Sequence, residues 1–221
     1  MELFLDTADA QAVKELGETL NIAGVTTNPT IITKSGKTPE QVIDQMCAVL
    51  APEQKFFMQV VAEDVEGMLE DARAIASIRP NMVVKIPVNQ NGYRAMKLAK
   101  AEGIAVLATG IYSPEQAFLA AMNGVDYMAP YVNRMCNYGD GVSQVAELQV
   151  MLENYGMEAK VCAASFKNVQ QVHELLVAGI ASATIAPDIV RAMFGHAGTA
   201  VAIQEFSSAW KASFGRTSFA K

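Results

Sequence analysis

The sequence predicts an α/β fold, a single-domain (β/α)8 TIM barrel with an additional C-terminal helix. Short apolar segments of strand type alternate with longer segments of helical periodicity, from the first residues almost to the end of the 221-residue chain. The strand-like segments number eight and are almost continuously apolar, as expected of parallel strands covered on both faces. The rival fold is a doubly wound sheet, but neither GxGxxG nor GxxxxGK(S/T) occurs in the chain.

Turn residues and capping signals mark the boundaries of these segments. The expected strands are 3–7, 24–27, 55–61, 82–88, 105–111, 127–131, 160–165 and 182–185. The expected helices are 9–20, 38–50, 64–78, 91–103, 113–124, 141–156, 168–179 and 187–195. Thr38 and Ser113 each precede a proline, the arrangement of an N-cap followed by proline at the first helical position. Glycines that can end helices are Gly103, Gly124, Gly156 and Gly179.

One domain accounts for the whole chain, because barrels of this size fold as single units. We assign 1–195 to the barrel and 196–221 to a C-terminal helical extension of the same domain. Apolar residues recur every four positions over 197–214, namely Ala202, Phe206, Trp210 and Phe214. This stripe either covers its own barrel or docks on a neighbouring subunit, and we favour the second interpretation.

Composition and charge exclude several classes of protein. Apolar residues make up 51% of the chain and charged residues 18%, which excludes a disordered chain. The net charge is −6, so nucleic acid and anionic membranes are not expected partners. The three cysteines, Cys47, Cys136 and Cys162, have neither disulfide-framework nor CxxC spacing, and no signal peptide or long apolar run is present. We expect a cytoplasmic protein.

Chemistry in a (β/α)8 barrel sits at the C-terminal ends of the strands, and polar side chains stand at seven of the eight expected ends. The candidate catalytic residues are Lys85, Tyr131, Asp6, Gln59 and Thr109. The candidate substrate-binding residues are Asn28, Thr27, Ser165, Arg134 and Lys167. A guanidinium beside a hydroxyl, as in Arg134 and Ser165, suits the phosphate of a substrate, although each residue alone is also typical of a surface.

Lys85 is the most informative of these residues because it interrupts the apolar strand 82–88. Burial lowers the pKa of an amine, and a neutral amine is a nucleophile toward carbonyl groups. The strand alone equally allows a lysine that extends to solvent or pairs with a structural acid. Asp6 could orient this amine or move its proton, because Asp9 is better placed to cap the helix 9–20. Gln59 and Thr109 are not acids or bases at neutral pH, so they either hold a water or simply fill the barrel.

Metal and hydrolase chemistry are not expected. The two histidines, His173 and His196, have no HExxH or paired spacing, and we interpret both as structural. No GxSxG motif occurs. We therefore expect neither a metal ion nor another cofactor.

Several motifs together resemble a known family. They are GVTTNPTII at 24–32, VVKIPV at 83–88, APYVNR at 129–134 and AASFK at 163–167, with LDTA at 5–8 and GRTS at 215–218. In these the chain is similar to the short transaldolase-type aldolases, the bacterial fructose-6-phosphate aldolases in particular, over almost its whole length. The resemblance implies a homo-oligomer, in pentameric rings or a decamer, joined by the C-terminal helix.

The resemblance also implies a metal-independent class I aldolase that reversibly cleaves fructose 6-phosphate to dihydroxyacetone and glyceraldehyde 3-phosphate, and that accepts related hydroxyketones. Lys85 would form a Schiff base with the ketone, and Asp6 would assist its proton transfers. Asn28 and Ser165 would bind the donor's hydroxyls, and Arg134 with Ser165 would bind the acceptor's phosphate.

Two positions distinguish an aldolase from a transaldolase in this family. Members that transfer the three-carbon unit have Glu where this chain has Gln59, and Phe where it has Tyr131. A phenol, with a water held by Gln59 and Thr109, favours release of the free ketone. We therefore expect an aldolase, with a transaldolase and a non-catalytic sugar-phosphate-binding barrel as alternatives.

One segment departs from the family pattern. The residues 135–141 read MCNYGDG and are one residue shorter than in the closest relatives. Tyr138 and Asp140 are expected near the phosphate. We expect the Asp140 carboxylate to weaken phosphate binding and to admit neutral aldehydes.

Overall fold

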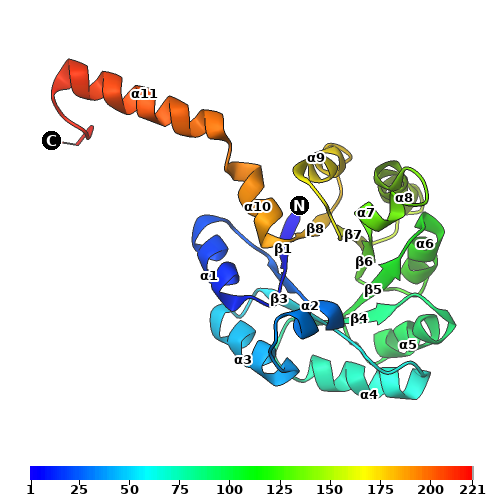
Figure 1. Ribbon diagram of the computed structural model, residues 1–221. Helices are drawn as coiled ribbons and strands as arrows, with labels where there is room; N and C mark the ends of the chain where they lie inside the picture. Colours follow the sequence, from blue (N-terminus) through cyan, green and yellow to red (C-terminus); the bar gives the residue numbers. More distant parts are fainter. Residues whose placement is uncertain (221) are drawn as a thin grey trace.

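The strands close into one parallel barrel in the computed structural model, which describes residues 1–220 (Figure 1). They are β1 (Glu2–Asp6), β2 (Gly24–Thr26), β3 (Lys55–Gln59), β4 (Met82–Pro87), β5 (Val106–Ile111), β6 (Tyr127–Pro130), β7 (Lys160–Ala163) and β8 (Ser182–Ile185). Strand order follows chain order, and β8 pairs with β1 to close the barrel. The expected barrel is therefore confirmed over the doubly wound sheet.

Most of the helices surround the barrel (Figure 1). The helices are α1 (Ala10–Thr19), α2 (Pro29–Lys34), α3 (Pro39–Val49), α4 (Val65–Ala76), α5 (Gln90–Ala101), α6 (Pro114–Met122), α7 (Val132–Met135), α8 (Gly141–Asn154), α9 (Val169–Val177), α10 (Pro187–Phe194) and α11 (Ala197–Phe214). The short helices α2 and α7 were not predicted. Both directly follow a strand end, and each is too short to produce a readable helical period.

The helix starts depend on the capping side chains that the sequence indicated. Thr38 and Ser113 cap α3 and α6, each with a proline in the first turn. Asp9 caps α1 by accepting hydrogen bonds from the backbone N–H groups of Gln11 and Ala12 at 3.0 and 3.3 Å. The prediction that Asp9 caps this helix is confirmed, and it leaves the carboxyl of Asp6 outside the cap.

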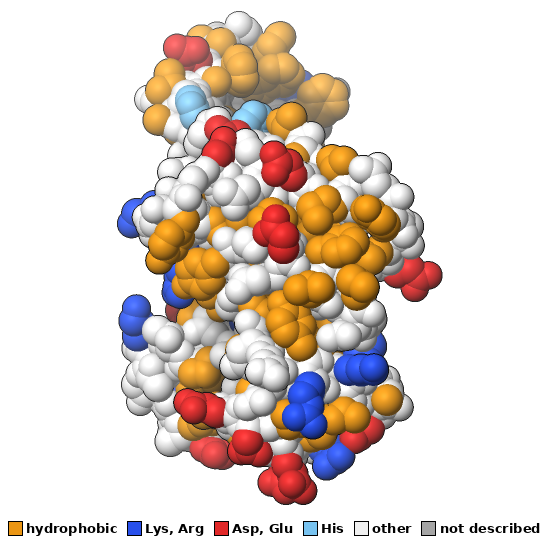
Figure 2. Space-filling view, turned by 90° about the vertical axis from the view of Figure 1, so that its right-hand side faces the viewer, with side chains coloured by type: hydrophobic (Ala, Val, Ile, Leu, Met, Phe, Trp, Pro, Cys, Tyr) orange, Lys and Arg blue, Asp and Glu red, His pale blue; other side chains and the backbone are white. Residues whose placement is uncertain are grey.

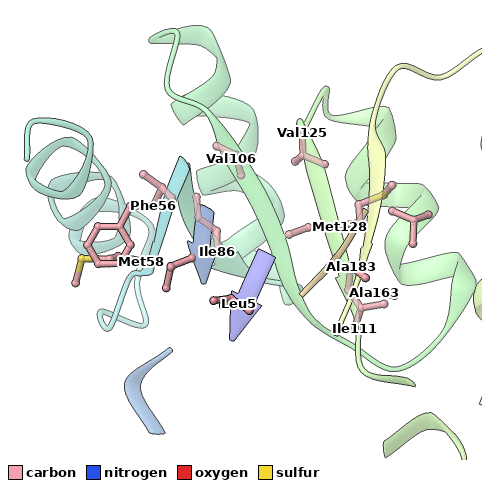
Figure 3. Close-up of a cluster of buried hydrophobic side chains, with 14 of the residues drawn as sticks. Leu5, Phe56, Met58, Ile86, Val106, Ile111, Val125, Met128, Ala163 and Ala183 are labelled. Atoms are coloured by element: carbon pink, nitrogen blue, oxygen red, sulfur yellow. The ribbon is translucent and has the colours of Figure 1, made fainter. Parts of the chain in front are cut away.

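The apolar residues form two separate layers because alternate strand residues face opposite sides. One layer fills the space between the barrel and its helices and includes Leu5, Ile86 and Met128 (Figure 3). The other fills the barrel interior around Phe4, Phe57 and Tyr127, which come from three strands that are not neighbours. All three of these rings pack edge to face, with centroids 4.9 to 6.0 Å apart.

Below the aromatic layer, the N-terminal end of the barrel is closed by an ion-pair cluster. Glu2 accepts hydrogen bonds from Lys55 and Lys160 at 3.0 and 3.1 Å, and from the Tyr127 hydroxyl at 3.0 Å. These hydrogen bonds lower the pKa of Glu2 against the opposing effect of its partial burial, which is the larger single influence. The polar groups at this end are thus committed to one another.

The C-terminal helix α11 extends away from the barrel (Figure 1). None of its residues, all of which the structure describes, is buried, and Phe206 and Phe214 are 70% and 60% exposed. His196 caps its start by accepting a hydrogen bond from the Gly198 N–H at 3.1 Å, and Trp210 stacks on Phe214. The interpretation that the stripe covers its own barrel is therefore wrong for this conformation. Lys221, the last residue of the extension, lies outside the described residues.

Across the described part of the chain, residues 1–220, every helix is too short or too polar to cross a bilayer.

Gly24 gives a test of the barrel register. It opens β2 with φ 149°, and a Cβ there would lie 1.9 Å from the backbone oxygen of Lys55 in β3. We expect Gly24→Ala to lower the free energy of unfolding by more than about 3 kcal/mol, measured by urea denaturation. Gly36→Ala, at φ 71° with open space around it, is the matched control and should cost only about 1–2 kcal/mol. Equal losses in the two variants would contradict this account of the register.

Candidate active site

A pocket of about 350 Å³ opens at the C-terminal ends of the strands. Its walls include seven of the ten candidate residues: Asp6, Asn28, Gln59, Lys85, Tyr131, Arg134 and Ser165. Lys34 of α2 and Thr184 of β8 also line it and were not predicted. The volume lies in the range typical of small-molecule sites. Residues from strands far apart in the sequence therefore converge on one concave site.

Two larger hollows are lined by several polar groups that are already paired. One of about 560 Å³ lies at the opposite end of the barrel beside Lys55, Tyr127 and Lys160, which are bonded to Glu2. Another, of about 770 Å³, shares Gln59 with the smaller pocket and otherwise faces Asp64 and Asn89, which cap helices α4 and α5. The smaller pocket alone contains a deeply buried cation.

Lys85 enters the pocket from the interior face of β4. It follows Val83 by two residues, so both face the barrel interior, while Val84 and Ile86 face the helices. The residue is 4% exposed, and its Nζ donates a hydrogen bond to the backbone oxygen of Thr27 at 2.6 Å. Burial lowers the pKa of Lys85, and the charge of Asp6 opposes that shift only in part. The amine is therefore biased toward its neutral, nucleophilic form.

Asp6 stands on β1, two residues beyond Phe4, and shares the pocket with Lys85. Burial raises the pKa of its carboxyl, while the charge of Lys85, a hydrogen bond from Thr26 and the charge of Arg134 act in the opposite direction. Burial thus favours the neutral form of both members of the Asp6–Lys85 pair. The two groups act on each other through their charges across the pocket, while the Lys85 amine makes its hydrogen bond to Thr27.

Tyr131 and Thr109 form a second polar pair. Their hydroxyl oxygens lie 3.0 Å apart, and either can be the donor. Thr109 is 1% exposed and lies behind Tyr131, which lines the pocket. Thr109 therefore acts on the pocket through the phenol rather than by direct contact.

Arg134 is held over the pocket by two tyrosines. Its guanidinium lies 4.8 Å from the centroid of the Tyr131 ring, and its Nη1 donates to the Tyr112 hydroxyl at 3.2 Å. The Tyr112 hydrogen bond is the main cause of the raised pKa of Arg134. Sequence reasoning missed Tyr112. A polar aromatic residue just after β5 was the available signal.

Ser165 and Asn28 line the same pocket, and the backbone conformation of each is set by its place in the fold. Ser165 has φ 61°, a left-handed conformation that is costly for a non-glycine residue and is common at functional sites. Asn28 accepts a hydrogen bond from the Ile31 N–H through Oδ1 at 2.9 Å, as the N-cap of α2. Its amide nitrogen is left to face a ligand.

Three predicted residues lie elsewhere. Thr27 is fully buried, and its Oγ1 donates to the Phe57 backbone oxygen, so its link to the pocket is the carbonyl that receives Lys85. Lys167 is exposed and is not part of the pocket wall. Asp140 is the N-cap of α8 and bonds to Ser143, not to the pocket. The expected place of Asp140 at the phosphate pocket is therefore wrong, while its effect on phosphate binding stays a prediction.

The Asp6–Lys85 coupling predicts a shift in the titration of Lys85. Asp6→Asn removes the attraction that favours the ammonium, so the pKa of Lys85 should fall further. The measurement is the pH dependence of carbamylation of Lys85 by cyanate, read by peptide mass spectrometry. Asp44→Asn, on an exposed side chain, is the matched control. An unchanged profile in Asp6→Asn would rule out the coupling.

Comparisons with known proteins agree with this architecture. One similar solved structure is a cube-shaped, highly porous protein cage designed by fusing symmetric oligomeric domains, with TM-score 0.59 and 16% identity, covering 97% of this chain and 80% of that one. Another, described as the native KDPGal structure, has TM-score 0.55 and 14% identity, covering 84% and 82%. These likenesses concern the fold. The family model described as "Transaldolase/Fructose-6-phosphate aldolase" matches residues 3–218 of the chain. The chain therefore belongs to that family of enzymes.

Proposed function

We propose that the chain is a class I aldolase that reversibly cleaves fructose 6-phosphate to dihydroxyacetone and glyceraldehyde 3-phosphate and accepts related hydroxyketone donors. The observation that carries the proposal is the burial of Lys85 at a pocket wall beside Asp6. Desolvation of the ammonium favours the neutral amine of Lys85. A neutral amine is a nucleophile that can attack the carbonyl carbon of a ketone.

The reaction follows from these two groups. The neutral Nζ of Lys85 adds to the ketone carbon, the carbonyl oxygen leaves as water, and a protonated imine remains. A base takes the proton of the hydroxyl on the fourth carbon, the bond between the third and fourth carbons breaks, and its electron pair forms an enamine. The aldehyde departs. Protonation of the enamine carbon and addition of water then free the ketone and the amine. Asp6, which shares the pocket wall with Lys85 and acts on it through its charge, would assist proton transfers at Nζ.

The phosphate-bearing end of the substrate would lie against Arg134 and Ser165. Arg134 keeps most of its five N–H donors free of the Tyr112 contact, and a guanidinium suits a phosphate. Tyr112 and Tyr131 fix its plane, which reduces the entropy lost when the phosphate binds. Lys34, on the same wall, adds a second positive charge.

Release of the ketone rather than its transfer is supported by Gln59 and Tyr131. Both line the pocket, where an amide and a phenol can hold a water and supply a proton to the enamine carbon. Transfer would require the enamine to survive until an acceptor aldehyde arrives. The family includes transaldolases, so transfer of dihydroxyacetone between sugar phosphates is the second candidate.

Lys85→Met gives the sharpest test of this proposal. Borohydride added with dihydroxyacetone should leave a reduced adduct on the Lys85 peptide of the wild-type protein, and Lys85→Met should lose turnover by at least about 10³-fold because no imine can form. Lys97→Met, on an exposed side chain, is the control and should keep full activity. Absence of both adduct and turnover in the wild-type protein would support a non-catalytic barrel, whereas turnover that persists in Lys85→Met would rule out Lys85 as the nucleophile.

The transaldolase alternative has its own readout. Fructose 6-phosphate should be cleaved without any added acceptor sugar. Cleavage that requires erythrose 4-phosphate would favour the transaldolase.

We further propose that α11 joins copies of this chain into a homo-oligomer. Its exposed Phe206 and Phe214 would be costly to leave in water on an isolated monomer. Exposed hydrophobic side chains also stand among the charges on the face of the molecule seen in Figure 2. On α6, Leu119 and Met122 are 52% and 64% exposed. Apolar surface on both α11 and the barrel's exterior suits contact between copies.

Light scattering after size exclusion tests this assembly. The wild-type chain should elute as an oligomer, and the double variant Phe206→Ser with Phe214→Ser should shift toward the monomer, because buried apolar area stabilises association. Val61→Ser, at a side chain that is 74% exposed and far from α11 in the sequence, is the control. A monomeric wild-type protein would refute the assembly.

A further inference from the structure

Three side chains from neighbouring strands form a buried hydrogen-bond chain that the proposed mechanism does not use. Thr26 of β2 donates through Oγ1 to Oδ1 of Asp6 at 2.8 Å. The same Oγ1 lies 2.6 Å from Oγ1 of Thr184 in β8. Thr26 is fully buried and Thr184 is 3% exposed, yet Thr184 lines the pocket that contains Lys85.

The strand register holds this chain in place. Asp6 is the register partner of Thr26 in the β1–β2 pair, so their side chains stand on the same face. Thr184 is in register with Phe4 in the β8–β1 pair, one inward position below Asp6. The barrel closure thus brings β2 and β8 to opposite sides of β1 and lets their hydroxyls meet across it.

The direction of the hydrogen bonds follows from a count of protons. A threonine hydroxyl has one proton to donate. Because Thr26 gives its proton to the Asp6 carboxylate, Thr184 must donate to Thr26. Thr184 then has no proton left for the pocket, and its oxygen can only accept.

Protonation of Asp6 permits the opposite direction. A carboxylic acid can donate a hydrogen bond to Thr26, and Thr26 can then donate one to Thr184. The Thr184 hydroxyl is then free to donate a hydrogen bond into the pocket. The charged groups that act on Asp6 in this arrangement are Lys85 and Arg134, both of which stabilise its ionised form. The polarity that Thr184 presents to a ligand is therefore tied to the ionisation of Asp6.

We propose that Thr184 is a substrate-positioning residue that accepts a hydrogen bond from a hydroxyl of the hydroxyketone donor bound at Lys85, with Thr26 linking it to Asp6. The inference rests on the proposed Schiff-base function and names a determinant of its donor class. A ketone without an adjacent hydroxyl cannot make this hydrogen bond, so Thr184 selects hydroxyketones over plain ketones. Ionised Asp6 is the state that keeps Thr184 an acceptor.

The test compares hydroxyacetone with acetone, which lacks the hydroxyl, as the ketone trapped on Lys85 by borohydride. Adduct yield is measured by peptide mass spectrometry at several concentrations of each ketone, for the wild-type protein, Thr184→Val and Thr184→Ser. Valine keeps the shape of threonine without the hydroxyl, and serine keeps the hydroxyl. We expect Thr184→Val to need about three- to tenfold more hydroxyacetone for half-maximal adduct, the loss typical of one hydrogen bond. Acetone should be unaffected, and Thr184→Ser should restore the preference.

A second variant guards against a folding defect in Thr184→Val. Thr26→Val removes the link to Asp6 and frees the Thr184 proton, so the ratio of hydroxyacetone adduct to acetone adduct should fall by about threefold, whatever happens to the total yield. A purely structural role would lower adduct yield with both ketones in parallel, and that result would overturn the proposal. An unchanged preference in both valine variants would overturn it as well.

Failure of the underlying function has a different signature. No adduct with either ketone in the wild-type protein would remove the Schiff-base chemistry and this inference with it. An adduct that forms equally well with both ketones in every variant would leave the Schiff base intact and remove Thr184 alone.

Discussion

The desolvation of one amine is the constraint on which the site depends. Lys85 occupies an interior position of β4, directly above the aromatic layer that plugs the barrel. Moving an ammonium into such a place is costly, and the cost falls when the group loses its proton. Closure of the barrel provides this environment, because it turns the inward face of β4 toward the aromatic layer. The fold and the proposed chemistry are therefore linked through a single side chain.

The lysines at the two ends of the barrel have opposite environments. At the N-terminal end, Lys55 and Lys160 are partly exposed and bonded to Glu2, so their charges are compensated and serve the structure. At the C-terminal end, Lys85 meets a backbone carbonyl and a carboxyl whose own pKa is raised by burial. The ion pairs at the N-terminal end contribute to stability. At the C-terminal end, burial opposes the charge of both Lys85 and Asp6. The hydrogen bond from Thr26 to Asp6 limits how far burial raises the pKa of Asp6.

Local sequence features predicted the barrel and most of the pocket residues, and there is a physical reason for this. Strand and helix periods, caps and breakers are short-range properties, and Lys85 is conspicuous because it contradicts its own strand. The misses are long-range or very short features. Thr26 and Thr184 are separated by 158 positions and meet only through barrel closure, and α2 is too brief to show a period. Asp140 was misplaced because its capping role depends on where α8 begins.

Direct titration of the Lys85 side chain tests the central claim. In ¹⁵N-labelled protein, the Nζ resonance of Lys85 can be followed by NMR across pH and assigned by its loss in Lys85→Met. The account predicts a midpoint for Lys85 below the ordinary lysine value of about 10.4. A Lys85 midpoint at or above that ordinary value would contradict the account, because the amine would then be charged at neutral pH and unable to attack a ketone.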